Sequence, residues 1–163
     1  MMIDMVEVKF NDADIDFCRN LGDRRSGSMG HRDTVNSYTM THKSRHRHFL
    51  GVVGELAYSK FSGLEVDSIT IGRGDDGTDF NNGINVKCSD SRNKPNLIFP
   101  VVQYQRKYSE YYVLVWYKEK IPYLLGWTTR NEIDLKHKIV DFGYGETVLF
   151  SNSLLNTMDS IPI

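Results

Sequence analysis

The sequence places one amphipathic helix before a series of strand-like segments, and this order restricts the folds open to the chain. Apolar residues recur with the spacing i, i+3, i+4, i+7 and i+8, which makes one helix face apolar. These positions are Phe49, Val52, Val53, Leu56 and Ala57. The strand-like runs that follow are "VDSITIG", "TDF", "INVKCS", "NLIFPVVQY", "YYVLVWY" and "PYLLGW". The order predicts an α/β or α+β fold, with a mixed central β-sheet flanked by helices.

Shorter elements are expected on either side of this region. "IDMVEVKF" predicts a short strand, and "DADIDFCRNLG" predicts a helix that ends at Gly22. Gly63 is expected to end the amphipathic helix in the same way. "TRNE", from Thr129 to Glu132, fits a capping box that opens a short helix, and "SNSLLNTMDSI" predicts a final helix.

Length and composition indicate one globular domain, residues 1–163. The chain has 163 residues, of which 40% are hydrophobic and 25% charged, close to ordinary globular usage. Its net charge is −1, so any affinity for nucleic acid must come from a local basic patch. There are two cysteines, no secretory segment at the N-terminus and no apolar run of membrane-spanning length. We therefore expect an intracellular, cytoplasmic protein without a membrane segment.

Residues 23–48 form such a basic patch. Between residues 24 and 48 there are six Lys or Arg residues and a single acid, Asp33. The segment is polar, and we expect a mobile or partner-ordered loop that leads into the helix. The six cations are Arg24, Arg25, Arg32, Lys43, Arg45 and Arg47.

Residues 74–90, "GDDGTDFNNGINVKCSD", combine a tight-turn signal with a polar strand face. Asn82-Gly83 is typical of a hairpin turn. Residues two apart in a strand share a face, so Asn85 and Lys87 point one way while Ile84 and Val86 point into the core. Asp79, across the turn, is then within reach of the Asn85–Lys87 face.

These residues resemble the core of the PD-(D/E)XK nuclease superfamily, which includes restriction, homing, junction-resolving and phage endonucleases. The resemblance covers roughly residues 49–130, and it implies a restriction-endonuclease-like core. It implies Glu55 as the helix acid, Asp79 as the first strand acid, Asn85 at the D/E position and Lys87 as the motif lysine. Glu55, Asp79 and Asn85 would hold Mg²⁺, with Mn²⁺ as a substitute, and Lys87 would assist the attacking water. The Gln-x-x-x-Tyr element of RecB-like members is absent, because Lys107 stands four residues after Gln103.

Asn85 is the main departure from the superfamily pattern, because an amide offers a metal ion only a neutral oxygen. Three explanations stay open. The protein is naturally impaired or inactive, or it uses another acid, or an engineered asparagine replaces an aspartate. The other candidate acids are Asp75, Asp76 and Asp90.

The resulting hypothesis is a metal-dependent endonuclease that acts on duplex or branched DNA. Cleavage of both strands favours a homodimer with two symmetric sites. The six cations of residues 23–48 are interpreted as phosphate contacts that position the duplex. A non-cleaving nucleic-acid-binding protein with a degenerate site is the rival hypothesis, and a nuclease for RNA is a third.

Overall fold

The computed structural model describes residues 4–30, 42–66, 80 and 83–162, with the side chains of 27–30 and 42–43 outside the description. The chain begins with β1 (Val6–Glu7), α1 (Asp12–Gly30), α2 (His42–Ser62), β2 (Ile84–Ser89), β3 (Leu97–Pro100) and α3 (Val101–Arg106). It continues with β4 (Tyr111–Lys118), β5 (Ile121–Thr129), α4 (Arg130–Lys136), β6 (Lys138–Asp141) and β7 (Glu146–Phe150). Two 3₁₀ turns, η1 (Asn152–Leu154) and η2 (Met158–Ser160), follow. The fold is mixed α+β, as the sequence predicts.

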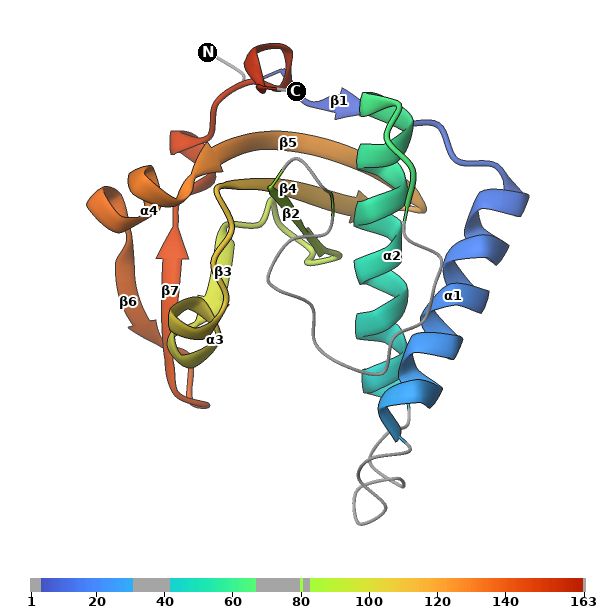
Figure 1. The fold of residues 1–163 in the computed structure, drawn as a ribbon, viewed down its shortest axis with the longest axis horizontal. Helices are drawn as coiled ribbons and strands as arrows, with labels where there is room; N and C mark the ends of the chain where they lie inside the picture. Colours follow the sequence, from blue (N-terminus) through green and yellow to red (C-terminus); the bar gives the residue numbers. More distant parts are fainter. Residues whose placement is uncertain (1–3, 31–41, 67–79, 81–82, 163) are drawn as a thin grey trace.

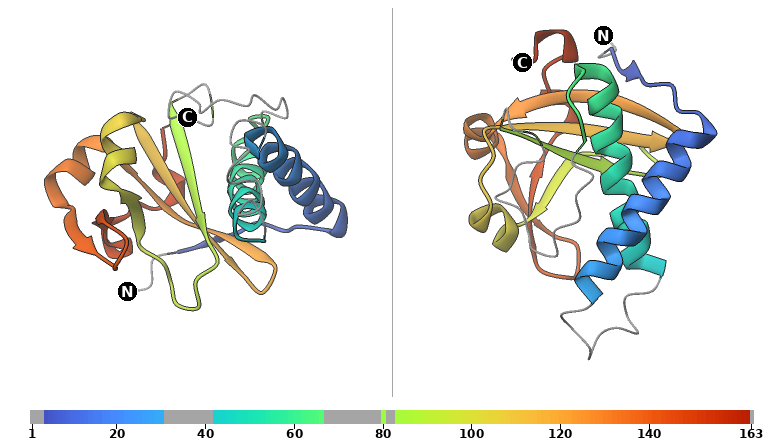
Figure 2. Two further views of the ribbon diagram at one scale, coloured as in Figure 1. Left: turned by 90° about the horizontal axis from the view of Figure 1, so that it is seen from below. Right: turned by 45° about the vertical axis from the view of Figure 1, so that its right-hand side comes forward.

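Two sheets and a helix pair form the layers of the molecule. The larger sheet has the order β1-β5-β4-β2, and it is mixed because β2 pairs with β4 in parallel while the other pairs are antiparallel. The smaller sheet has the order β3-β7-β6. The pair α1–α2 lies on one side of the large sheet, and α3, α4 and the small sheet lie on the other (Figures 1 and 2). One apolar cluster lies between α2 and the large sheet, and a second lies between the two sheets.

The N-terminal helix is longer than the sequence predicts. Gly22 does not end it, since α1 continues to Gly30. A Cβ atom at Gly22 would lie 2.9 Å from the backbone nitrogen of Phe49, so this glycine lets the backbones of α1 and α2 approach each other. The expected loop over residues 23–48 is also wrong in part, because 23–30 belong to α1 and 42–48 to α2. Residues 31–41 lie outside the described residues.

Several strand and cap predictions are confirmed. "INVKCS" is β2, and "YYVLVWY" and "PYLLGW" lie in β4 and β5. Helix α2 ends at Ser62, and Gly63 follows with φ +81°. The hydroxyl of Thr129 accepts a hydrogen bond from the Glu132 backbone nitrogen and caps α4. Most of "VDSITIG" and "TDF" lies outside the described residues.

Other predictions are wrong for identifiable reasons. The run "NLIFPVVQY" divides at Pro100, where β3 ends and α3 begins, because proline has no N–H for the ladder and its φ suits a helix start. The expected final helix is replaced by η1 and η2. Between these turns Asn156 exchanges two backbone hydrogen bonds with Trp127 and so pairs with β5. The hairpin β6–β7 is not predicted, since β6 is mostly exposed and lacks an apolar alternation.

No described helix combines the length and the apolar character needed to cross a membrane.

Candidate functional site

A tight turn leads into β2, the strand that carries Asn85 and Lys87. The backbone nitrogen of Phe80 donates to the oxygen of Ile84 (3.2 Å), and that of Gly83 donates to the oxygen of Phe80 (3.1 Å). Gly83 has φ +81°, a conformation that suits glycine. Phe80 and Ile84 therefore face each other across a turn, as the Asn82-Gly83 signal predicts. Asp79, the predicted first strand acid, lies outside the described residues.

One face of β2 packs against α2. Ile84 and Val86 are buried in the cluster shared with Ala57 and Tyr58 of α2. A Cβ atom at Gly54 would lie 3.0 Å from Cβ of Cys88 and 3.1 Å from Cγ1 of Val86. Gly54 therefore allows the close approach of helix and strand.

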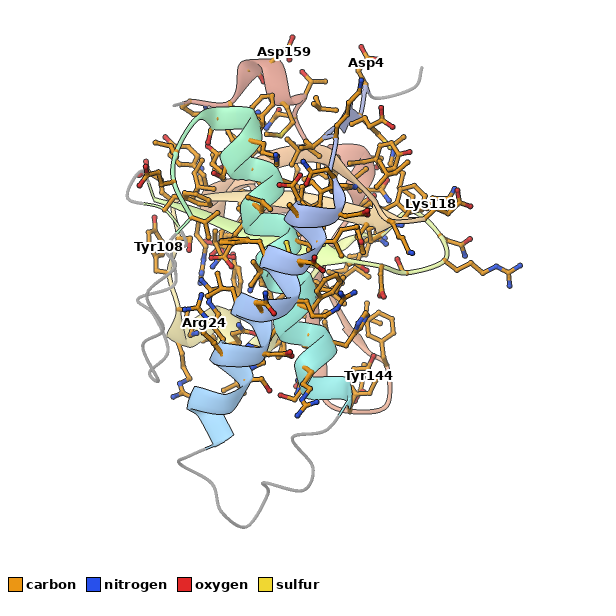
Figure 3. All side chains as sticks on the ribbon, turned by 90° about the vertical axis from the view of Figure 1, so that its right-hand side faces the viewer. Asp4, Arg24, Tyr108, Lys118, Tyr144 and Asp159 are labelled. Atoms are coloured by element: carbon orange, nitrogen blue, oxygen red, sulfur yellow. The ribbon has the colours of Figure 1, made fainter. Side chains whose placement is uncertain are left out.

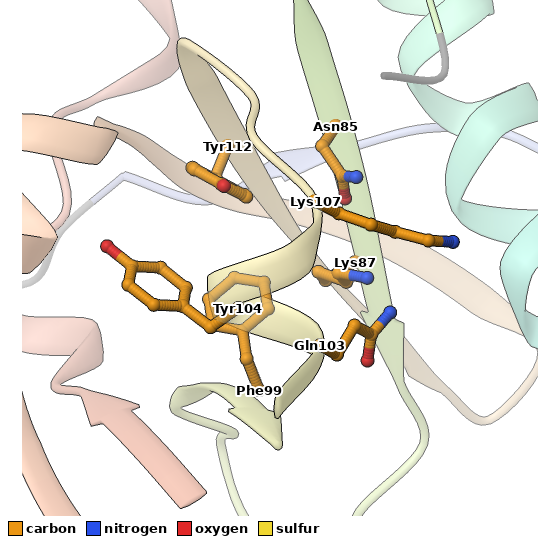
Figure 4. Close-up of a pocket in the computed structure, with 7 residues that line it drawn as sticks. All are labelled: Asn85, Lys87, Phe99, Gln103, Tyr104, Lys107 and Tyr112. Atoms are coloured by element: carbon orange, nitrogen blue, oxygen red, sulfur yellow. The ribbon is translucent and has the colours of Figure 1, made fainter. Parts of the chain in front are cut away.

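The opposite face of β2 lines a small pocket. Asn85 is 7% exposed, and the Nζ atom of Lys87 lies 5.4 Å from the ring centroid of Phe99. Seven described residues line this pocket: Asn85, Lys87, Phe99, Gln103, Tyr104, Lys107 and Tyr112. In Figure 4 the ends of Lys87, Lys107 and Gln103 point in the same direction across β2. The predicted common face of Asn85 and Lys87 is confirmed, and it opens onto a pocket with a second lysine.

Glu55, the predicted helix acid, is buried in an ion pair. Its carboxylate accepts hydrogen bonds of 2.5 and 3.4 Å from the guanidinium of Arg25 on α1, and the two side chains are 8% and 23% exposed. Arg25 also acts on His48 of α2: burial lowers the pKa of this histidine, and the charges of Arg47 and Arg25 act in the same direction. Glu55 is not among the described residues that line the pocket of Asn85 and Lys87.

The other predicted site residues are distributed as follows. Arg24 on α1 is exposed (Figure 3), and so are Arg45 and Arg47 in the first turns of α2. Arg25 contacts Glu55. Asp90 follows β2, and its carboxylate lies 2.6 Å from Nε2 of His46 on α2. Outside the described residues are Arg32, Asp75, Asp76 and the side chain of Lys43.

Two cations at or beside the pocket, Lys107 and Arg130, were not predicted as site residues from the sequence. The guanidinium of Arg130 lies 3.5 Å from the ring centroid of Tyr104 and donates to the backbone oxygens of Tyr104 (2.8 Å) and Lys107 (3.1 Å). Burial raises the pKa of Tyr104, and its hydrogen bond to Asp134 adds to the effect. Lys107 directly follows α3 with an extended backbone, and its backbone nitrogen donates to the oxygen of Gln103. Its place beside Gln103 can therefore be recognised only once residues 101–106 are known to be helical.

Comparison with protein family models, curated proteins and solved structures finds no match for this chain.

Proposed function

We propose that the chain is a metal-dependent endonuclease that hydrolyses DNA phosphodiester bonds on a restriction-endonuclease-like core. The observation that carries the proposal is the arrangement of β2. Its lysine and the asparagine two residues earlier share a pocket, while its other face packs on a helix that carries a buried acid. The turn at Phe80 to Ile84 supports the helix–hairpin–strand order that the superfamily resemblance implies.

The proposed cofactor is Mg²⁺ or Mn²⁺, and the described residues alone do not complete a site for it. Among them, no three His, Cys, Asp or Glu side chains gather in a metal-binding group. Glu55 is held by Arg25, and Asn85 offers only an amide oxygen. The proposal therefore depends on Asp79. A bound divalent ion would neutralise charge on the phosphate and acidify a water molecule.

The chain's own residues have separate proposed roles. Lys87 orients the attacking water or stabilises charge on the phosphate. The exposed cations Arg24, Arg45 and Arg47 contact backbone phosphates without reading bases. A homodimer would place two such sites on the two strands.

The test is nicking of supercoiled plasmid in Mg²⁺ or Mn²⁺ by the wild type and by Asn85→Asp. We expect Asn85→Asp to cleave faster, because a carboxylate adds a charged oxygen to the site. Both forms should lose activity in EDTA. Asn93→Asp is the matched control, since Asn93 is exposed and outside the pocket lining, and it should behave as the wild type.

The same assay on duplex, branched and single-stranded DNA, with RNA as competitor, defines the substrate. The enzyme proposal fails if folded Asn85→Asp cleaves none of these at any metal concentration.

A second candidate is a nucleic-acid-binding protein that does not cleave. Two observations favour it: residue 85, which the resemblance aligns with the D/E position, is an asparagine, and the Glu55 carboxylate is engaged by Arg25. If this second candidate is correct, both the wild type and Asn85→Asp bind DNA with an affinity independent of Mg²⁺, and neither nicks the plasmid.

A further inference from the structure

The pocket beside β2 contains two lysines that come from separate parts of the chain. Lys87 belongs to β2, and Lys107 directly follows α3. The backbone nitrogen of Lys107 donates to the oxygen of Gln103 at the end of that helix (3.0 Å). Gln103 lines the same pocket one helical turn earlier.

Arg130 fixes the chain on both sides of the Lys107 side chain. Its guanidinium donates to the backbone oxygens of Lys107 and Tyr104 and to the hydroxyl of Tyr112 (3.2 Å). The Ser109 backbone nitrogen donates to the same hydroxyl (3.3 Å). The Arg130 side chain is 15% exposed and stacks on Tyr104, so this network is largely shielded from water. The backbone of Lys107 is therefore held in place, unlike the backbone of a lysine in an open loop.

The chemistry of the pocket lining suits an anion with several oxygens. None of the seven described lining residues is acidic, and two are lysines. The amides of Gln103 and Asn85 add neutral N–H donors. A phosphate presents several acceptor oxygens and carries the negative charge that two ammonium groups favour.

We propose that this pocket binds one backbone phosphate of the substrate, with Lys107 as a phosphate ligand beside Lys87 and Arg130 as the positioning residue for Lys107. The inference rests on the proposed function, because it names the group of the nucleic acid that the site holds. It assigns to Lys107 a role that is separate from that of the exposed cations on α1 and α2.

The test measures binding of a fluorescent DNA duplex by anisotropy in EDTA, over a series of salt concentrations. Lys107→Ala should weaken binding about tenfold, the value of one charge-assisted hydrogen bond. It should also lower the slope of log affinity against log salt by about 0.9, the loss of one phosphate contact. Lys107→Arg should keep the wild-type slope.

Lys118→Ala is the matched control. Lys118 is the last residue of β4, whereas Tyr108, which directly follows Lys107 in the sequence, comes shortly before that strand begins. Tyr108 and Lys118 lie on opposite sides of the molecule in Figure 3. Lys118→Ala should change neither affinity nor slope. Unchanged affinity and slope in Lys107→Ala, or an equal loss in Lys118→Ala, would overturn the inference.

A second measurement separates this inference from the proposed function. Inorganic pyrophosphate should raise the Tm of the wild type and raise that of Lys107→Ala less, with each shift measured against the same protein without pyrophosphate. If pyrophosphate binding depends on Lys107 but no DNA binds, the phosphate pocket stands and the nuclease proposal fails. DNA binding and cleavage that are independent of Lys107 would leave the nuclease and remove the pocket assignment. Binding of neither ligand would contradict both.

Discussion

On the face of β2 that meets α2, Ile84 and Val86 are buried among apolar side chains, and the helix approaches so closely that position 54 is a glycine. On the opposite face of the same strand, Asn85 and Lys87 line a pocket with polar and cationic neighbours. Successive side chains of one strand thus serve packing and candidate chemistry in turn. The parallel register with β4, which pairs Asn85 with Tyr112 and Lys87 with Leu114, holds the two sets on their own faces.

The strongest test of this division compares adjacent residues on the two faces. Lys87→Ala should lower the single-turnover nicking rate about 100- to 1000-fold, as for loss of a group that stabilises transition-state charge. The assay uses the wild type, or Asn85→Asp if only that form cleaves. The stability of Lys87→Ala should change by less than about 1 kcal/mol, since Lys87 is only partly buried.

Val86→Ala is the counterpart on the helix face. It should lower the free energy of unfolding by about 2 kcal/mol, because it removes two buried methyl groups, and leave the nicking rate of the folded protein nearly unchanged. Urea unfolding followed by circular dichroism measures the stability of each variant. A rate loss in Val86→Ala as large as that in Lys87→Ala would break the comparison.

The ion pair on the helix side tests whether Glu55 has a structural role. Arg25→Met should lower the free energy of unfolding by about 3 kcal/mol, because the Glu55 carboxylate stays buried without this guanidinium. Its neighbour Arg24 is exposed, so Arg24→Met should change stability by less than about 0.5 kcal/mol. Adding Glu55→Gln to Arg25→Met should restore part of the loss, and two independent, additive effects would contradict the pairing.

The sequence predicts the helix face of β2 well, because burial there imposes an alternation that a single segment displays. Ile84 and Val86 are apolar, Asn85 and Lys87 are not, and the strand has the predicted bounds. Another local rule, that a glycine ends a helix, fails at Gly22. The role of Gly22 depends on the backbone of Phe49, a residue remote in sequence. Glycine at a helix end and glycine at a helix crossing are identical in sequence, so only the packing of α1 on α2 distinguishes them.

The pocket face could be predicted only in part. Asn85 and Lys87 follow from strand periodicity, but Lys107 requires knowledge that the chain turns into a helix at Pro100 and returns parallel to β2. The contacts of Arg130 with Lys107 and Tyr112 join segments that are 23 and 18 residues apart. Such contacts follow from the topology, which a local pattern does not specify.

Gly54 offers a test of how tightly the helix face is packed. Gly54→Leu should lower the free energy of unfolding by about 1–3 kcal/mol, because its side chain meets Cys88 and Val86. Gly51 is the matched control on the same helix, since a Cβ atom there meets no described atom within 4 Å. Gly51→Leu should raise stability by up to about 1 kcal/mol through helix propensity. Equal effects at the two positions in thermal or urea unfolding would contradict the close approach of α2 and β2.

Substitution of Asp90 has the smallest expected effect on stability and on the nicking rate. It tests whether the residue at the end of β2 belongs to the helix face or to the pocket face. Asp90 is one of the three acids proposed to replace a charge at position 85, yet its carboxylate is paired with His46 of α2, and both side chains are about half exposed. Asp90→Asn should therefore change the free energy of unfolding by less than about 1 kcal/mol, the range of an exposed pair. The nicking rate should equal that of the parent form, because the carboxylate contacts the helix side and is not among the described pocket residues. A rate loss of the size expected for Lys87→Ala would instead assign Asp90 to the reaction and show that the end of β2 serves both faces.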